Sequence, residues 1–126
     1  NQLELTNNVI LKGQLTHEET RQQMEWADIY IQPSIQEGFC NSVLEAQAMG
    51  LLCIVTNAEG LSENVKHSET GWVINKRSAV NIVDAIINII SLKIEDIYNI
   101  RGNAISHVRN TFNLDRQIKK FIDFYV

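Results

Sequence analysis

The chain carries, between residues 33 and 50, the stretch PSIQEGFCNSVLEAQAMG. It predicts a loop that leaves a strand at Pro33 and enters a helix over about 42–49, which the last glycine ends. Two carboxylates, those of Glu37 and Glu45, lie on either side of the expected helix start. The first N–H groups of a helix lack internal partners and the helix dipole is positive there, so this start can hold an anion.

Strand and helix patterns alternate on both sides of this stretch. β-branched and aromatic residues predict a strand at 28–32, and the apolar run LLCIVT predicts a strand at 51–56 that is buried on both faces. Further strands are expected at 8–13 and 71–75, with helices at 16–27, 61–65, 78–91, 94–111 and from 113 onward. This alternation predicts a single α/β domain over residues 1–126, a Rossmann-like parallel sheet of about four strands with flanking helices.

The loops at 33–41 and 57–60 both leave the carboxyl ends of expected strands, where sheets of this kind bind ligands. The carboxylate of Glu37 could accept hydrogen bonds from sugar hydroxyls. The amides of Ser42, Val43 and Leu44 are the groups that a diphosphate would contact at the helix start. A molecule with hydroxyls at both ends and phosphates between them, such as a nucleotide-sugar, fits this pattern.

The same residues also allow simpler interpretations. Ser42 and Glu45 have the spacing of a capping box, in which Glu45 only stabilises the start of the helix. Glu37 could be a solvated loop acid, and Gly38 could serve only a turn. Phe39 is better explained as a packed anchor of the loop than as a stacking surface for a ligand.

Composition excludes several classes of function. A formal net charge of −4 argues against a nucleic-acid surface. No apolar run reaches the length of a membrane span, and the amino-terminal residues lack the pattern of a signal peptide. Cys40 and Cys53 lie in no metal-binding spacing with the three histidines, which predicts reduced thiols in a cytosolic protein and no metal site.

Together these residues resemble the C-terminal, donor-binding domain of GT-B retaining glycosyltransferases of group 1, the family 4 type. The likeness lies in ADIYIQPS at 27–34, the E-x7-E pair formed by Glu37 and Glu45 with its flanks, the loop with Gly60 and Glu63, and TGWVI at 70–74. It covers about residues 8–90 in unbroken order.

The resemblance implies a function and a role for each motif residue. It implies transfer from a nucleotide-diphosphate sugar to a sugar or lipid-linked acceptor with retention of configuration, in glycan or surface polysaccharide biosynthesis, without a metal or other cofactor. Glu37 would contact the donor sugar at the reaction centre, and Glu45 would bind the ribose hydroxyls. The further implied donor-binding residues are Gly38, Phe39, Cys40, Asn41, Ser42 and Val43. The implied location is the cytoplasm, with peripheral attachment of the full-length protein to a membrane left open.

The sequence departs from the family pattern at four places. One is Leu52-Cys53, where the family usually has Pro-Val after the helix glycine. Cys40 stands where the family usually has glycine, so its side chain would crowd the sugar, and Glu59 replaces the first glycine of a Gly-Gly loop. Residues 1–8 do not supply the first two strand–helix units of the family's domain, whose Arg…Lys pair neutralises the diphosphate. Because an N-terminal acceptor domain is also missing, we expect the isolated chain to transfer nothing.

Without those units one edge of the sheet would be exposed. Either the strand at 9–11 pairs beside the strand at 29–31, or another chain covers the edge, which leaves self-association open. The alternative function is a non-catalytic, transferase-like module for binding or assembly, which Cys40 and Glu59 favour.

Overall fold

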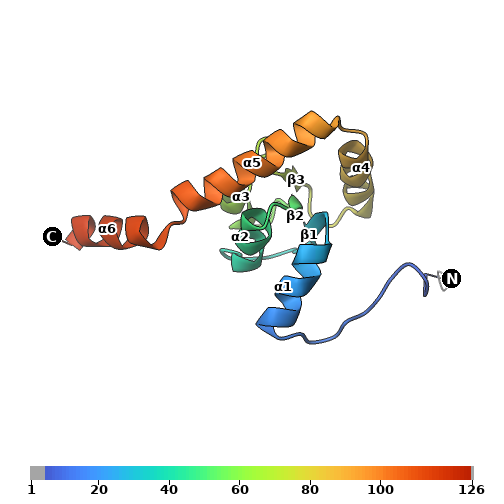
Figure 1. Cartoon of the computed structure of the whole chain (residues 1–126), viewed down its shortest axis with the longest axis horizontal. Coiled ribbons are helices and arrows are strands. Elements are labelled where there is room, and N and C mark those ends of the chain that lie inside the picture. Colours follow the sequence, from blue (N-terminus) through green and yellow to red (C-terminus); the bar gives the residue numbers. More distant parts are fainter. Residues whose placement is uncertain (1–4, 126) are drawn as a thin grey trace.

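The structure is a computed structural model that describes residues 5–125, the side chains at 117, 120, 121 and 125 excepted. Nine helices and strands follow one another in this part of the chain (Figure 1). Their bounds are α1 His17–Trp26, β1 Ile29–Gln32, α2 Asn41–Ala48, β2 Leu52–Thr56, α3 Leu61–Asn64, β3 Trp72–Ile74, α4 Ala79–Ile90, α5 Ile94–Thr111 and α6 Leu114–Tyr125.

The three strands form a parallel sheet in the order β1-β2-β3. Ile29 of β1 pairs with Leu52 of β2, and Ile54 of β2 pairs with Trp72 of β3. β2 lies in the centre, and all five of its residues are buried. The α/β fold with a parallel sheet and flanking helices is therefore confirmed, and so is a central strand buried on both faces.

The strand expected near Val9–Leu11 is wrong, so within residues 5–125 the sheet has three strands and not four. This segment is extended but unpaired with β1, and the side chain of Leu11 is 92% exposed. An apolar run becomes a strand only where a neighbouring edge accepts its hydrogen bonds. Pairing of Val9–Leu11 beside β1 is excluded in this structure, whereas coverage of the edge by another chain stays a prediction.

Each face of β2 has its own apolar layer. Cys53 and Val55 point into one layer, which joins the sheet to α1, α2 and α3. Leu52 and Ile54 point into the other, which α4 and α5 cover. The alternation follows from the period of two in a strand, and it fixes α2 and α4 on opposite faces of the sheet.

The ends of two helices follow from side chains that the sequence shows. Thr16 and Glu19 form a capping box at the start of α1, with the Thr16 N–H donating to Glu19 Oε2 at 2.8 Å. Ser78 caps α4 by accepting from the N–H of Asn81. α5 packs against α2 and β2, and its Arg101 forms an ion pair with Asp28, the residue before β1.

Candidate functional site

Two loops at the carboxyl edge of the sheet are packed backbone against backbone. Gly60, in the loop after β2, has a φ of +87°, and a Cβ placed there would lie 2.4 Å from the carbonyl oxygen of Gly38. Such a distance is far inside van der Waals contact, so only glycine allows the loop after β2 to support the loop after β1. The Thr56 hydroxyl adds a second tie by donating to the carbonyl of Ser34.

A buried asparagine holds the start of α2. The side chain of Asn64, at the end of α3, accepts from the N–H of Cys40 at 3.3 Å and donates to the carbonyl of Cys40 at 3.4 Å. Cys40 is the N-cap of α2, and among the side chains that the structure describes none caps that helix. The next amides, those of Asn41, Ser42 and Val43, occupy positions where an α-helix provides no carbonyl partner.

The capping box of Ser42 and Glu45, which the sequence left open as an alternative, is not formed among the described residues. α2 begins at Asn41, so Ser42 is already its second residue and Glu45 its fifth. The clamp of Asn64 on Cys40 sets this earlier start. Glu45 is exposed, and its carboxylate forms no hydrogen bond or ion pair with any residue that the structure describes. The side chain is thus available to a ligand rather than used by its own helix.

Glu37, half-buried in the loop after β1, belongs to a chain of side-chain hydrogen bonds. Tyr30 Oη donates to Gln32 Oε1 at 2.7 Å, Gln32 Nε2 donates to Ser34 Oγ at 2.8 Å, and Ser34 Oγ donates to Glu37 Oε2 at 2.8 Å. This series of hydrogen bonds begins on β1 and ends on the loop, and it fixes one carboxylate oxygen of Glu37. The other oxygen, Oε1, has no hydrogen-bond partner among the described residues.

Tyr30 links this network to α2. Burial raises the pKa of the Tyr30 phenol above its usual value, the nearby Cys40, Cys53 and Glu45 groups add to the rise, and the nearby Ser42 hydroxyl opposes it. The hydroxyl therefore stays protonated at neutral pH and can donate. Tyr30, Gln32 and Ser34 were expected only as parts of a strand and its end, although their alternation along residues 30–34 places all three on one face.

Phe39 anchors the loop, as expected. The centroid of its ring lies 5.2 Å from that of Phe112, the C-cap residue of α5. The Phe112 and His107 rings meet edge-on, with their centroids 5.4 Å apart. Phe39 nevertheless stays 47% exposed, so one part of the ring still faces solvent. These contacts join the loop after β1 to the far end of α5, more than 60 positions further along the chain.

The thiol of Cys40 does not face the site. Cys40 is buried in the apolar layer with Met24 and Val43, so the expected crowding of a sugar by this side chain is not seen. Its amide is also occupied, by Asn64. Gly38, Asn41 and Ser42 are exposed at the loop and the helix start, and Val43 is buried below them.

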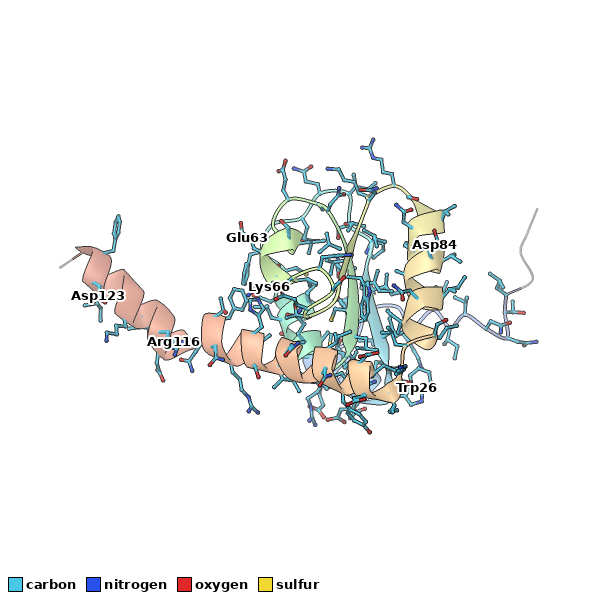
Figure 2. The ribbon with its side chains drawn as sticks, turned by 90° about the horizontal axis from the view of Figure 1, so that it is seen from above. Trp26, Glu63, Lys66, Asp84, Arg116 and Asp123 are labelled. Carbon is cyan, nitrogen blue, oxygen red and sulfur yellow. The ribbon has the colours of Figure 1, made fainter. Side chains whose placement is uncertain are left out.

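The remaining sequence predictions concern Glu63, metal binding and membrane spans. Glu63 is exposed on α3, and Lys66 stands two residues after the end of that helix; Figure 2 labels both residues. The described residues contain no group of three or more histidine, cysteine or acidic side chains close enough for a metal ion. In that same part of the chain, no helix combines the length and the apolar composition that crossing a membrane requires.

Asn64 and Thr56 are two further residues of the site that sequence reasoning missed. Asn64 was expected only as part of a short helix, and Thr56 only as the end of a strand. Neither has a local signal, because the partners of both lie more than 20 positions away in the chain. A polar residue that ends a fully apolar strand is the one hint that Thr56 offers.

The sequence matches the family model of glycosyl transferases group 1 over residues 1–107. The chain belongs to the group 1 glycosyltransferases. The resemblance found over about 8–90 is thereby confirmed and extended along the chain.

Relatives of this glycosyltransferase chain are longer. It is 30% identical over 100 residues to the UDP-Gal:alpha-D-GlcNAc-diphosphoundecaprenol alpha-1,3-galactosyltransferase of Escherichia coli. The match covers 79% of this chain and 25% of that enzyme, so the chain spans about a quarter of the relative's length.

Solved structures of GT-B enzymes have the same fold. The match to sucrose-phosphate synthase from Thermosynechococcus elongatus covers 96% of this chain and 30% of the synthase chain, with a TM-score of 0.84 and 26% identity. HepE of Anabaena, in complex with UDP-glucose, matches 83% of this chain and 30% of its own, with a TM-score of 0.71. At 22% identity, HepE shows likeness of fold alone.

Proposed function

We propose that the chain binds a nucleotide-diphosphate sugar and forms the donor-binding part of a retaining glycosyltransferase of glycan or surface polysaccharide biosynthesis. One observation carries the proposal: Asn64 and Gly60 hold the start of α2 and its loop in place, with the carboxylates of Glu37 and Glu45 on either side. Membership of the group 1 family supports it, and so does the UDP-glucose held by HepE, a protein of the same fold.

The diphosphate and the ribose would share one face of α2. The amides of Asn41, Ser42 and Val43, with the positive end of the helix dipole, suit the phosphate oxygens. Glu45 lies four residues after Asn41 and therefore on the same face, one turn further along. In a nucleotide the ribose is bonded directly to the phosphate, so a carboxylate one turn away suits its two hydroxyls.

Glu37 would act on the transferred sugar. Ser34 and Gln32 fix Oε2 of Glu37, which leaves Oε1 to accept from a sugar hydroxyl or to face positive charge that develops on the ring. The leaving diphosphate would be stabilised at the same time by the α2 amides, in the manner of preorganised hydrogen-bond donors. In this proposal the reaction needs no metal ion, and the acceptor binds to a part of the protein outside this chain.

Titration of UDP and of GDP into the chain, followed by calorimetry or by NMR, tests donor binding. Replacing Glu45 with alanine removes two hydrogen bonds to ribose, which we expect to weaken nucleotide binding roughly tenfold or more. Asp84→Ala is the matched control, because Asp84 is an exposed helix acid on α4, on the opposite face of the sheet (Figure 2).

Absence of nucleotide binding at millimolar concentration, or equal binding by Glu45→Ala and the parent chain, would contradict the proposal. The non-catalytic alternative predicts that outcome. Of the two residues that favoured this alternative, Cys40 loses its force because its thiol lies in the core. Transfer of sugar by the chain alone is not expected, since it spans only part of its relatives' length.

A further inference from the structure

A small pocket of about 300 Å³ opens at the carboxyl edge of the sheet, beside the candidate donor site. Three loops line it, one after each strand: Ile35 and Gln36 follow β1, Glu59 follows β2, and Lys76 and Arg77 follow β3. The carboxyl edge is where parallel α/β sheets bind their ligands. Neither cation of this pocket belongs to the site described above.

The loop that carries both cations is fixed to its neighbour. The Lys76 N–H donates to Asn57 Oδ1 at 2.9 Å, and Asn57 Nδ2 donates to Asn75 Oδ1 at 3.3 Å. The Asn57 N–H donates in turn to the carbonyl of Ile74 at 2.7 Å. Three hydrogen bonds of one asparagine thus set the backbone that presents Lys76 and Arg77 to the pocket.

Arg77 is held in an unfavourable backbone conformation. Its φ is +63°, in the left-handed region that glycine adopts without cost and that other L-residues enter at a cost of roughly 1 kcal/mol or more. A side chain kept at such a position despite this cost is a candidate for function. Here the side chain is a guanidinium, the group best suited to phosphate and carboxylate.

The two cations have no carboxylate partner among the residues that the structure describes. Neither Lys76 nor Arg77 forms an ion pair there, although Glu59 lines the same pocket and the chain carries a net charge of −4. Both side chains are exposed. Two adjacent cations on a fixed loop, in a pocket and without an ion pair to any described carboxylate, are suited to an anion supplied by a ligand.

We propose that the pocket formed by Ile35, Gln36, Glu59, Lys76 and Arg77 binds a phosphate group of a substrate. The phosphate would come either from the nucleotide-sugar donor or from a phosphorylated acceptor. The choice between these two molecules rests on the proposed function, whereas phosphate binding by the pocket does not. Glu59 shares the pocket and repels the anion, so it lowers the affinity of the site and can accept from a neighbouring hydroxyl.

Titration of the chain with pyrophosphate at low salt tests the pocket. The double variant Lys76→Ala/Arg77→Gly should lose at least tenfold in affinity, and glycine at 77 should keep or raise the melting temperature because it relieves the positive φ. Lys93→Ala/Arg109→Ala is the matched control: it removes two exposed cations from α5 and its N-cap, with the same change in net charge. Glu59→Gln should tighten pyrophosphate binding severalfold.

Equal losses in the pocket variant and in the control would overturn the proposal, since binding would then reflect net charge alone. A pocket variant that binds pyrophosphate like the parent chain would overturn it as well. Unfolding does not explain a loss in Lys76→Ala/Arg77→Gly if the melting temperature holds.

Two further ligands distinguish the source of the phosphate. If the donor supplies the phosphate, the pocket variant should bind UDP more weakly than the parent chain does. If a phosphorylated lipid acceptor supplies it, the variant should bind isopentenyl diphosphate, a short analogue of such an acceptor, more weakly and should bind UDP as the parent chain does. Glu45→Ala separates this proposal from the proposed function, because it should weaken UDP and spare pyrophosphate. If the chain binds pyrophosphate through Lys76 and Arg77 but never binds UDP, the pocket stands and the proposed function fails.

Discussion

At the scale of single residues, the site depends on one glycine contact. Gly60 touches the Gly38–Phe39 peptide so closely that its missing side chain is what brings two loops together. At Gly38 itself a Cβ would meet no other atom within 4 Å, and the backbone is not in the left-handed region. The residue that most constrains the loop of Glu37 is therefore a glycine in a different loop.

Replacing Gly60 with alanine should damage both stability and donor binding. The new Cβ meets the carbonyl of Gly38 and sits at a φ of +87°, so we expect a loss of at least about 2 kcal/mol in the free energy of unfolding. Urea denaturation measures it, and UDP titration should show weaker binding. Gly102→Ala is the control: that glycine lies inside α5 with open space around it, and alanine should add about 0.5–1 kcal/mol. An unchanged stability of Gly60→Ala would contradict this account.

The sequence singled out the acids and glycines of the candidate site, but not the residues that hold them. Glu37, Glu45 and Gly60 could be singled out because they stand at positions of motifs that resemble the family pattern. Asn64 and Thr56 could not, since their partners Cys40 and Ser34 lie far away in the chain. A hydrogen bond between distant segments leaves no periodic signal in the sequence.

At the scale of elements, α3 matters because it fixes where α2 starts. The local pattern placed the start of α2 at Ser42, where the spacing to Glu45 is that of a capping box. The structure places the N-cap at Cys40, because Cys40 packs into the core and Asn64 satisfies both its backbone groups. Tertiary packing thus overrides a local capping preference of about 1 kcal/mol.

Replacing Asn64 with alanine should release the start of α2. The N–H of Cys40 would lose its partner in a buried place and its carbonyl would lose one donor, which we expect to cost about 1–3 kcal/mol in the free energy of unfolding. Donor binding should weaken as well, because the amides of Asn41 and Ser42 follow directly. Asn99→Ala is the comparison, an exposed asparagine on α5 with no hydrogen bond from its side chain to the described residues. If the two variants unfold alike, Asn64 is no clamp.

At the scale of the whole molecule, the elements were predicted well and the number of strands was not. Strong periodicity located every helix and the three paired strands within about two residues of their observed ends. The segment Val9–Leu11 has the composition of a strand but pairs with no strand within residues 5–125, and composition alone does not supply the neighbouring strand that pairing needs. Within residues 5–125, Val9–Leu11 and β1 do not pair, which leaves the apolar side chains of the segment exposed and β1 at the edge of the sheet.

β2 connects the two apolar layers, so its burial should control stability at high pH. Burial raises the pKa of the Cys53 thiol to about 12 from 9.0. A raised pKa means that the folded state retains the proton, so stability is fully present below pH 9 and is lost as the pH rises towards 12. With about 1.36 kcal/mol for each pKa unit, the loss approaches about 4 kcal/mol at the upper end of this range.

The free energy of unfolding, measured in urea from pH 8 to pH 11, should therefore fall steeply for the parent chain. Cys53→Ala should be less stable at pH 8, because it leaves a cavity, yet should lose less on going to pH 11. Val55→Ala is the control on the same face of β2: it also leaves a cavity but keeps the thiol and the steep alkaline loss. Tyr30, whose pKa is also raised, contributes to the slope in all three proteins, so only the difference between variants reports on Cys53. Equal slopes for Cys53→Ala and Val55→Ala would show that the central strand does not keep its thiol protonated.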